Sequence, residues 1–257
     1  MSAGPGSSSA RPVRSPAIGR ASGVPGGRPP GLTERIPSKF VLILGLDTAT
    51  PAVTVALHNG GQPLAQLVTV DGHRHAELLS PAISKVIADA GVARTDLTGI
   101  GVGVGPGPYT GLRVGLVTAR VLGDALSIPV YGVCSLDVIA ADVEADTGFL
   151  VATDARRREV YWAEYDERGS RVAGPAVNTP ADVPSRDRPV AGEGALLYPG
   201  FLPNGTGPTY PAAITLCRMM AAALAAGDES RLLQPDPLYL RRPDAREPGD
   251  PKRVSQS

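Results

Sequence analysis

Short apolar runs near the start of the chain predict three neighbouring strands. Residues 40–46 (FVLILGL) are continuously apolar, which is typical of a strand buried on both faces. Residues 52–58 (AVTVALH) alternate and predict a second strand. The Asn-Gly-Gly turn at 59–61 then leads to a third strand over 62–70. The pattern therefore predicts an antiparallel meander of three strands.

Helical periodicity begins after this meander. Apolar residues recur near a 3.6-residue period up to Gly91, which ends the first helix. Thr110 is the expected N-cap of a second helix, and Ser135 of a third, short one. The expected elements are, in order, a helix over 76–90, a strand over 99–104, a helix over 111–126 and a strand over 130–133.

The opening pattern recurs in the second half of the chain. Residues 149–153 (FLVAT) predict a buried strand, and residues 159–165 (EVYWAEY) predict the strand that returns from it. An aspartate follows the first strand of each copy, Asp47 and then Asp154. A repeated strand–Asp–turn–strand start, with helices later in each half, indicates an α/β fold of two related lobes.

These elements predict where the folded part begins and ends. We expect a first lobe over 39–145 and a smaller second lobe over 146–240, with the helix of the second lobe at 212–226. Residues 1–38 contain 21 Gly, Pro and Ser residues, a composition typical of a disordered leader. Residues 241–257 read as a polar tail. Since the sequence has neither a secretory signal nor a run of about 18 apolar residues, we expect a cytoplasmic protein with no membrane partner.

Composition excludes several classes of protein. Gly (31) and Pro (26) are too frequent for an all-helical bundle. Two distant cysteines, Cys134 and Cys217, exclude a disulfide scaffold or a thiolate zinc site. The net charge is zero, and residues 1–38 contribute five Arg against one Glu. The remainder is therefore mildly acidic and has no overall electrostatic footprint for nucleic acid.

Candidate chemistry begins with the two aspartates. Asp47 and Asp154 follow strands, at the edge where open α/β sheets bind ligands. A carboxylate there can hold a metal-bound phosphate or a water. The alternative is that each aspartate only starts a turn.

The glycine-rich loop before the second long helix is another candidate. Gly105, Gly107 and Thr110 lie near a helix N-terminus, whose free N–H groups favour anions. The spacing fits neither GxGxxG nor GxxxxGK[ST], and two prolines remove donors. The alternative is a rigid turn, with glycines at every fourth position, 107, 111 and 115, allowing close packing of the helix.

Two further clusters have weaker signals. His73 and His75 are two residues apart, which is a poor spacing for one metal, so a surface or capping role is expected. The turn Arg156-Arg157-Arg158 reads as an exposed turn, with a nucleotide or RNA contact as the alternative.

Seven segments of the chain match one known family in the family's order. They are ILGLDTATPAVTVAL (43–57), HRHAELLSPAI (73–83), GVGVGPGPYTGLRVGLVTARVL (101–122), IPVYGVCSLDVIA (128–140), TDARRREVYWAEY (153–165), AGEGA (191–195) and PLYLR (237–241). Through these segments the chain resembles the bacterial TsaB (YeaZ) family. Two departures are Pro108-Tyr109, where the family usually has Ser-Phe, and Arg158, where it often has Gly.

The resemblance implies a fold and a role. The fold is the actin/Hsp70/sugar-kinase (ASKHA) superfold with a reduced second lobe. The role is that of a non-catalytic paralogue of the TsaD transferase, which it would pair with and activate. With a TsaE-like ATPase, such a complex installs N6-threonylcarbamoyladenosine next to the anticodon of tRNA. The chain would bind no metal or cofactor of its own and meet tRNA only through the complex. ATP or ADP with Mg²⁺ at the subunit interface, and a homodimer of the free chain, are left open.

The resemblance also implies that the two long helices of the first lobe form the partner interface. The alternative is that their small and apolar residues belong to the internal core. The residues expected at this interface are Leu78, Ala82, Val86, Gly111, Gly115 and Ala119.

Two other functions stay open on the sequence. An ASKHA-type small-molecule kinase would use Asp47 and Asp154 near ATP and Mg²⁺, although the short second lobe leaves little room for adenosine. A metallopeptidase is the third reading, but the sequence has neither HExxH nor a well-spaced histidine pair.

Overall fold

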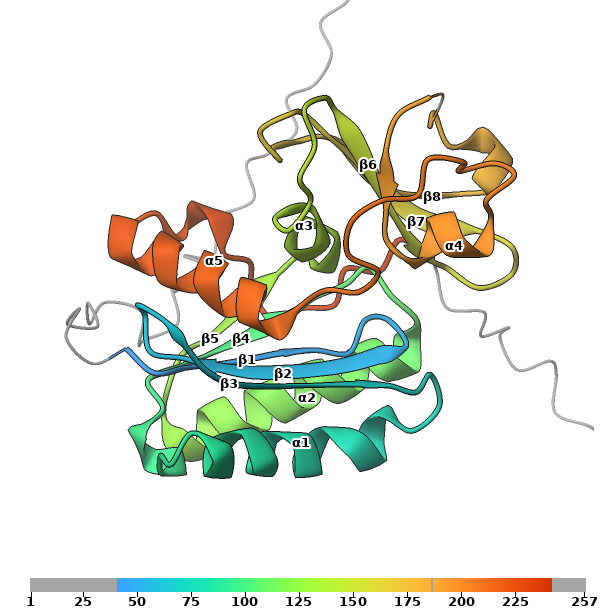
Figure 1. The fold of residues 1–257 in the computed structure, drawn as a ribbon. Helices are drawn as coiled ribbons and strands as arrows, with labels where there is room; N and C mark the ends of the chain where they lie inside the picture. The colour runs from blue at the N-terminus through green and yellow to red at the C-terminus, as the bar shows by residue number, and fades with distance from the viewer. Residues whose placement is uncertain (1–40, 186, 242–257) are drawn as a thin grey trace, which may run out of the picture. The chain divides into compact units, whose positions relative to one another are not determined.

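The computed structural model describes residues 41–185 and 187–241, and their strands form two sheets (Figure 1). The leader and the tail beyond Arg241 lie outside the described residues. The first sheet has the order β3-β2-β1-β4-β5 and the second β8-β7-β6-β9. The strands are β1 (Ile43–Asp47), β2 (Ala52–His58), β3 (Pro63–Val70), β4 (Gly99–Gly103), β5 (Val130–Val133), β6 (Phe149–Asp154), β7 (Val160–Tyr165), β8 (Arg171–Asn178) and β9 (Val190–Ala191).

The two sheets begin with the same topology. β1 pairs antiparallel with β2 and parallel with β4, while β6 pairs antiparallel with β7 and parallel with β9. β3 and β8 complete the two antiparallel meanders. The predicted α/β class and the repeated strand pattern are therefore confirmed. The sequence analysis missed β8, where Gly174-Pro175 interrupts the strand pattern and the register with β7 shifts.

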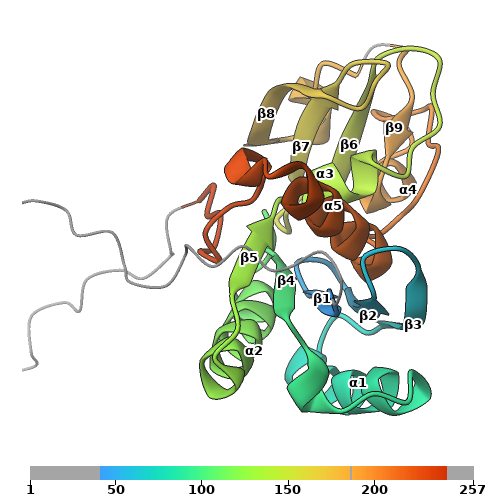
Figure 2. The same cartoon turned by 90° about the vertical axis from the view of Figure 1, so that its left-hand side faces the viewer.

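Helices cover both faces of the first sheet. α1 and α2 pack on one face, and α5 packs on the other (Figures 1 and 2). α3 and α4 pack against β6 of the second sheet. Among the described residues, no helix combines the length and the apolar character needed to cross a membrane. The helices are α1 (His75–Asp89), α2 (Tyr109–Leu126), α3 (Ser135–Ala140), α4 (Glu193–Leu197) and α5 (Ala213–Ala226).

α5 packs against the first sheet, although the sequence analysis assigned this helix to the second lobe. Cys217 and Met220 belong to one cluster of buried apolar residues with Ile43 of β1. At Gly45 any side chain would collide with Cys217 and with the backbone of Ala213, so a glycine is needed under the helix. Burial on both faces explains why the β1 sequence is continuously apolar.

The opposite face of the first sheet holds the largest apolar core. Alternate residues of β1 and β2 point toward α1 and α2, as the two-residue period of a strand requires. Burial of these side chains supplies the main stabilisation of the lobe, at about 25 cal/mol per Å² of apolar surface. The core includes Leu44, Leu46, Val53, Val55 and Leu57 from the strands, Leu79, Ala82 and Val86 from α1, and Leu112, Leu116 and Ala119 from α2.

The start of α2 lies directly against the turn that follows β1. A Cβ atom at Gly107 or Gly115 would lie closer than 3.0 Å to atoms of this turn. The Thr48 hydroxyl donates to the Gly111 carbonyl (2.7 Å) and accepts from the Gly115 amide (3.0 Å). The expected close packing through glycines is confirmed, and the element that approaches is the β1–β2 turn.

Two expected helix caps are wrong. α2 begins at Tyr109 with Pro108 as its N-cap, so Thr110 already lies in the first turn. Ser135 is the first residue of α3, whose N-cap is Cys134. The Ser135 hydroxyl instead accepts from the Gly105 amide and donates to Asp47, because the buried carboxylate needs a partner.

The segment after α5 returns to the first sheet and then reaches the turn after β6. Leu233 forms a β-bridge with Gly132 at the free edge of β5. The Leu238 amide donates to the carbonyl of Val104, the residue after β4. The ring of Tyr239 lies 4.6 Å from that of Tyr109. Arg241, which the sequence analysis placed in the tail, donates to the Ala155 carbonyl (3.1 Å).

Gly115→Ala tests the close approach of α2. We expect the substitution to lower the free energy of unfolding by about 1–3 kcal/mol, since the new methyl group overlaps the Thr48 hydroxyl. Urea denaturation measures this. Gly200→Ala is the matched control, because nothing lies within 4 Å of its Cβ position, and its change should stay within about 0.5 kcal/mol. Equal stabilities of the two variants would contradict the packing described here.

Candidate functional site

A pocket of about 300 Å³ lies beside the β1–β2 turn, and we call it the turn pocket. Its wall combines the turn with the β3–α1 loop and the starts of α1 and α2. A single residue, Arg156, comes from the turn after β6. The polar residues that line it are Thr48, Thr50, His73, His75, Thr110 and Arg156.

His75 is part of the wall of the turn pocket and is nine-tenths buried. Its Nε2 lies 2.8 Å from the Thr50 carbonyl oxygen, so the ring ties the start of α1 to the β1–β2 turn. A surface role for His75 is therefore wrong, whereas His73 is exposed as expected. Within residues 41–185 and 187–241, no group of three His, Cys, Asp or Glu side chains could hold a metal ion.

Asp47 is fully buried and bonded to the protein on both oxygens. Its Oδ1 accepts from the Ala49 amide (2.7 Å) and its Oδ2 accepts from the Ser135 hydroxyl (2.6 Å). Burial raises the pKa of Asp47 to about 6, and both hydrogen bonds partly oppose this rise. A side chain at Gly103 would collide with the carboxylate, which packs tightly on β4. Asp47 therefore fixes the turn and α3 from inside and does not line the turn pocket.

The other candidate nucleotide-site residues divide between the pocket and the interior. Gly105 and Gly107 are buried and do not line the turn pocket, whereas Thr110 does. Asp154 accepts from the Arg156 amide (2.8 Å) and pairs with the Arg156 guanidinium at 3.4 Å. Asp154 thus starts the turn after β6 and reaches the pocket only through Arg156.

The three arginines after Asp154 form an exposed turn, as expected. Their φ angles are 60°, 55° and 61°, so three consecutive non-glycine residues adopt the left-handed region. Each such residue costs on the order of 1 kcal/mol or more, and the surrounding structure must hold it there. The turn contains no glycine, so nothing in its sequence predicts this backbone conformation.

A second, apolar hollow lies between α1 and α2, and we call it the helix groove. Its volume is about 480 Å³. Val117 and Val121 of α2 line it and are 58% and 60% exposed, respectively. The sequence analysis missed both valines, although their spacing of four residues places them on one face of the helix. The α1 residues that line it are Ser80, Ile83, Ser84 and Ile87.

Most residues expected at the partner interface lie instead inside the lobe. Ala82, Val86 and Ala119 are at most 5% exposed, and Gly111 and Gly115 are also buried. They pack against the sheet and the β1–β2 turn, so the internal-core alternative applies to them. Leu78 is half-buried.

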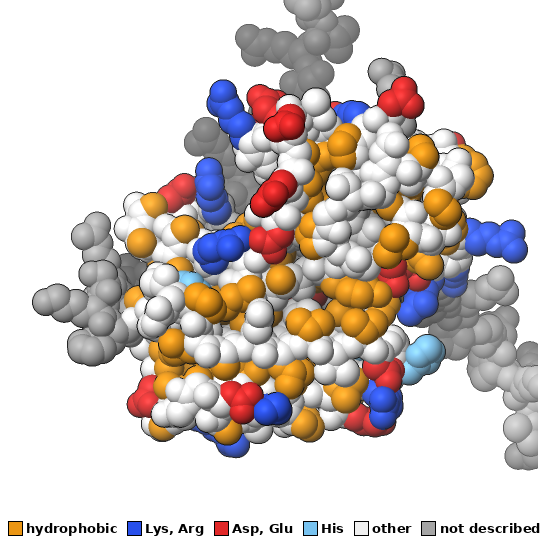
Figure 3. All heavy atoms as spheres, in the orientation of Figure 1, with side chains coloured by type: hydrophobic (Ala, Val, Ile, Leu, Met, Phe, Trp, Pro, Cys, Tyr) orange, Lys and Arg blue, Asp and Glu red, His pale blue; other side chains and the backbone are white. Residues whose placement is uncertain are grey.

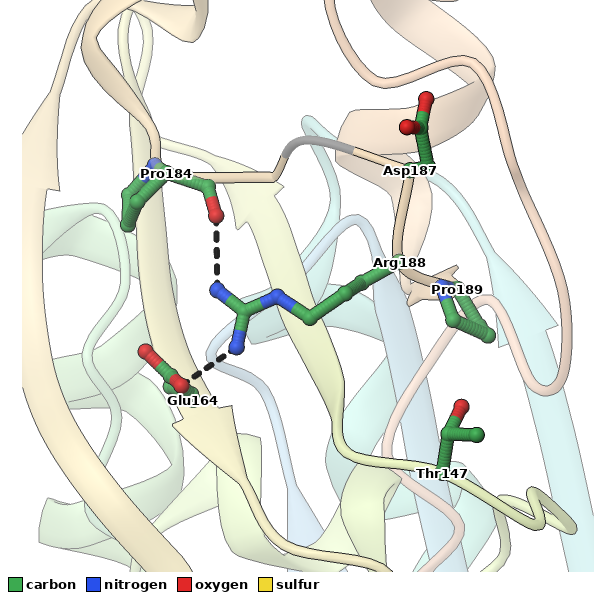
Figure 4. Close-up of a pocket in the computed structure, with 6 residues that line it drawn as sticks. All are labelled: Thr147, Glu164, Pro184, Asp187, Arg188 and Pro189. Atoms are coloured by element: carbon green, nitrogen blue, oxygen red, sulfur yellow. Dashed lines mark hydrogen bonds and ion pairs between the residues drawn. The ribbon is translucent and has the colours of Figure 1, made fainter.

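A third hollow, of about 660 Å³, lies at the second sheet (Figure 4). Arg188 crosses it, forming an ion pair with Glu164 of β7 and donating to the Pro184 carbonyl (2.6 Å). These contacts tie Arg188 to β7 and to Pro184. Pro184 and Pro189 are drawn on either side of Arg188, and Thr147 and Asp187 complete the wall.

Two lobes that each begin with a meander, and whose first strand pairs parallel with a later one, define a protein of the ASKHA fold class. The family model described as "TsaD: tRNA N6-adenosine threonylcarbamoyltransferase" matches residues 69–197. The tRNA threonylcarbamoyladenosine biosynthesis protein TsaB of Escherichia coli K12 is 31% identical over 224 residues, covering 77% of this chain and 94% of that protein. The chain belongs to the TsaB (YeaZ) family.

Other relatives extend this similarity. An uncharacterized protein of Mycobacterium tuberculosis H37Rv is 48% identical over 211 residues, which cover 79% of this chain and 93% of that protein. The solved structure of YeaZ from Pseudomonas aeruginosa has a TM-score of 0.67 at 30% identity. It covers 78% of this chain and 100% of that one.

Asp47→Asn tests the buried carboxylate. Because the pKa of Asp47 in the folded state is raised from 3.8 to about 6, its protonated carboxyl group stabilises the folded state at low pH. This stabilisation is lost as the pH rises through about 6. Relative to the wild type, the Asn variant should therefore gain on the order of 2–3 kcal/mol between pH 4 and pH 7. Urea denaturation across this pH range measures the gain.

A second variant, in which Ser135 is replaced, tests how a hydrogen-bond partner moves the pKa of Asp47. Ser135→Ala removes a hydrogen bond that lowers the pKa of Asp47, so its stability loss should continue to a higher pH than in the wild type. Parallel pH profiles for the wild type and Asp47→Asn would refute the raised pKa.

Proposed function

We propose that this chain is a non-catalytic subunit that supports synthesis of N6-threonylcarbamoyladenosine in tRNA by pairing with a TsaD-type transferase through the helix groove. Membership of the TsaB (YeaZ) family supports a role in the synthesis of this modified nucleoside. The single observation that carries the pairing is the exposed apolar surface of the groove, where Val117 and Val121 lie more than half in solvent. Exposed apolar patches of this kind mark protein interaction sites.

The groove has the layout of an interface. Its floor is apolar, with Leu44 and Leu122 below the two exposed valines. Ser80 and Ser84 are small, so the helix of a partner could approach α1 closely. Arg94 is the one charged residue that lines the groove, and Lys85, which pairs with Asp89 at 3.0 Å, lies outside its lining. An apolar centre with a polar rim is the usual anatomy of a protein interface.

The geometry around Asp47 supports a role without catalysis. A carboxylate that is bonded to Ala49 and Ser135 and closed off from solvent is committed to holding the fold. The transferase would therefore supply the reacting groups and most contacts to tRNA, in the cytoplasm. A TsaE-like ATPase would join the pair, and two copies of the free chain would associate through the same groove.

Reconstitution tests the proposal. The chain and the TsaD-type transferase of the same organism are mixed and analysed by size exclusion with light scattering, and we expect a complex containing equal numbers of both. Modification of tRNA is then followed by mass spectrometry of its nucleosides, with and without the chain. We expect modification only when the chain is present. Failure to form a complex, at low salt and with ATP, would exclude the proposed pairing.

Substitutions in the groove localise the interface. Val117→Asp and Val121→Asp should each weaken transferase binding at least about tenfold, because a buried carboxylate without a partner costs more than 1.4 kcal/mol. Val172→Asp in β8 is the matched control, since Val172 is also 58% exposed and lies on the other sheet. Binding is measured by calorimetry, and melting temperatures verify folding. If the groove variants bind as tightly as the control, the interface lies elsewhere.

A further inference from the structure

β3 is a free edge of the first sheet. The strand order β3-β2-β1-β4-β5 gives it one neighbour, and Figures 1 and 2 show it at the rim of the sheet. Within the part of the chain that the structure describes, no strand pairs with its outer side. We propose that this edge pairs with β3 of a second copy of the chain. The two strands would run antiparallel about a two-fold axis, so that one sheet extends through both copies.

The pairing with β2 determines which backbone groups of β3 point outward. The Asp71 amide donates to the Pro51 carbonyl (2.9 Å), directly after the last residue pair of the ladder. In an antiparallel ladder, residues bonded to the neighbouring strand alternate with residues whose N–H and C=O groups point away from it. From residue 65 on, the odd-numbered residues therefore bond to β2. The backbone groups that point to the free edge belong to Gln66, Val68 and Val70.

This edge lacks the features that usually prevent sheet edges from pairing. Charges, prolines, bulges or a covering segment protect most exposed edges. β8, one edge of the second sheet, begins with Arg171 and contains Pro175, where its register with β7 shifts. Leu233 covers the outer edge of β5. β3 has no charged residue, and its proline and its register shift both lie at its start, before residue 65.

A second copy matches this edge in pattern and in charge. When Val68 lies opposite Val68 of the other copy, Gln66 lies opposite Val70, and every outward backbone group has a partner. The side chains of Val68 and Val70, each 56% exposed, would then cover one another on one face of the joined sheet.

The absence of charge favours an identical partner in particular. A two-fold axis sets each strand against an identical one, and like charges directly opposite one another are destabilising. The uncharged β3 makes no such contact. Figure 3 shows hydrophobic and uncharged atoms over the strip between α5 and α1 where β3 lies, with charged side chains on either side.

The contact is separate from the helix groove. None of the residues that line the groove belongs to β3. A pair of chains joined at β3 therefore keeps both grooves open for a transferase, and this inference goes beyond the proposed function without resting on it. A strand pair buries less surface than a permanent interface, so we expect a reversible pair.

Amide hydrogen exchange and sedimentation velocity of the ¹⁵N-labelled full chain test the proposal. The chain carries Val117→Asp, which removes association through the groove. It is measured from about 10 μM to about 1 mM, the range of weak affinities. At low concentration the amides of Gln66, Val68 and Val70 should exchange faster than those of the residues between them, because only the latter bond to β2. At high concentration we expect dimers, and slower exchange of the three outward amides.

Two results of these measurements would overturn the proposal. One is a monomer throughout the concentration range. The other is slow exchange of the three outward amides at every concentration, because a segment of the same chain, such as residues 1–40, would then cover the edge.

Substitutions at the two-fold axis locate the contact. Val68→Lys and Val68→Glu should each weaken the pairing about fivefold, since like charges then lie opposite one another. An equal mixture of the two variants should restore it, because lysine then lies opposite glutamate. Val172→Lys in β8 is the matched control, since Val172 is 58% exposed and lies on the other sheet. Melting temperatures verify folding. If Val68→Lys pairs as tightly as the control, or the mixture pairs no more tightly than either variant alone, the two copies do not meet at this edge.

Discussion

The contact between the β1–β2 turn and the start of α2 is the constraint on which the first lobe depends. Thr48 bonds to both Gly111 and Gly115, and only glycines leave space for the turn to reach the helix. This approach sets how deeply α2 lies on the sheet, and His75 fixes α1 to the same turn. The spacing of the two helices, and with it the groove between them, follows from a few hydrogen bonds at one corner of the sheet. The corner behaves as a rigid unit because a packed interior tolerates little displacement.

The same corner explains why the carboxylate of Asp47 is closed to ligands. A strand-end aspartate is commonly available to ligands in open α/β sheets. Here Ser135 and the Ala49 amide occupy both oxygens of Asp47, and β4 packs against it through Gly103. The polar surface that stays accessible lies on the outer side of the turn, where Arg156 and the helix ends meet. The same packing therefore encloses the Asp47 carboxylate and leaves the accessible polar groups on the outer side of the turn.

The sequence predicted local features well and non-local ones poorly. Hydrophobic period and turn residues identified the first meander and the β6–β7 hairpin of the second, because strand alternation and hairpin turns are encoded within about ten residues. The face of α1 and α2 that meets the sheet was assigned wrongly, since Ala82 and Val86 form one of two apolar stripes and periodicity alone cannot say which is covered. The position of α5 on the first sheet was missed because it depends on contacts between residues about 170 positions apart in the sequence, as between Cys217 and Ile43. Among the residues that line the turn pocket, Thr110 was a candidate from the sequence, whereas the position of Arg156 depends on a turn geometry with no sequence signal.

The position of α5 has a consequence for the order in which the chain acquires its structure during synthesis. The first sheet is complete once β5 has been made, yet one of its faces stays uncovered until residues 213–226 emerge from the ribosome. At about 5–20 residues per second, an apolar sheet surface remains exposed for several seconds while the whole second lobe is translated. Such a surface is a natural target for chaperones. A chain that stops before residue 213 would therefore leave one face of the first sheet uncovered, although that sheet itself was made in full.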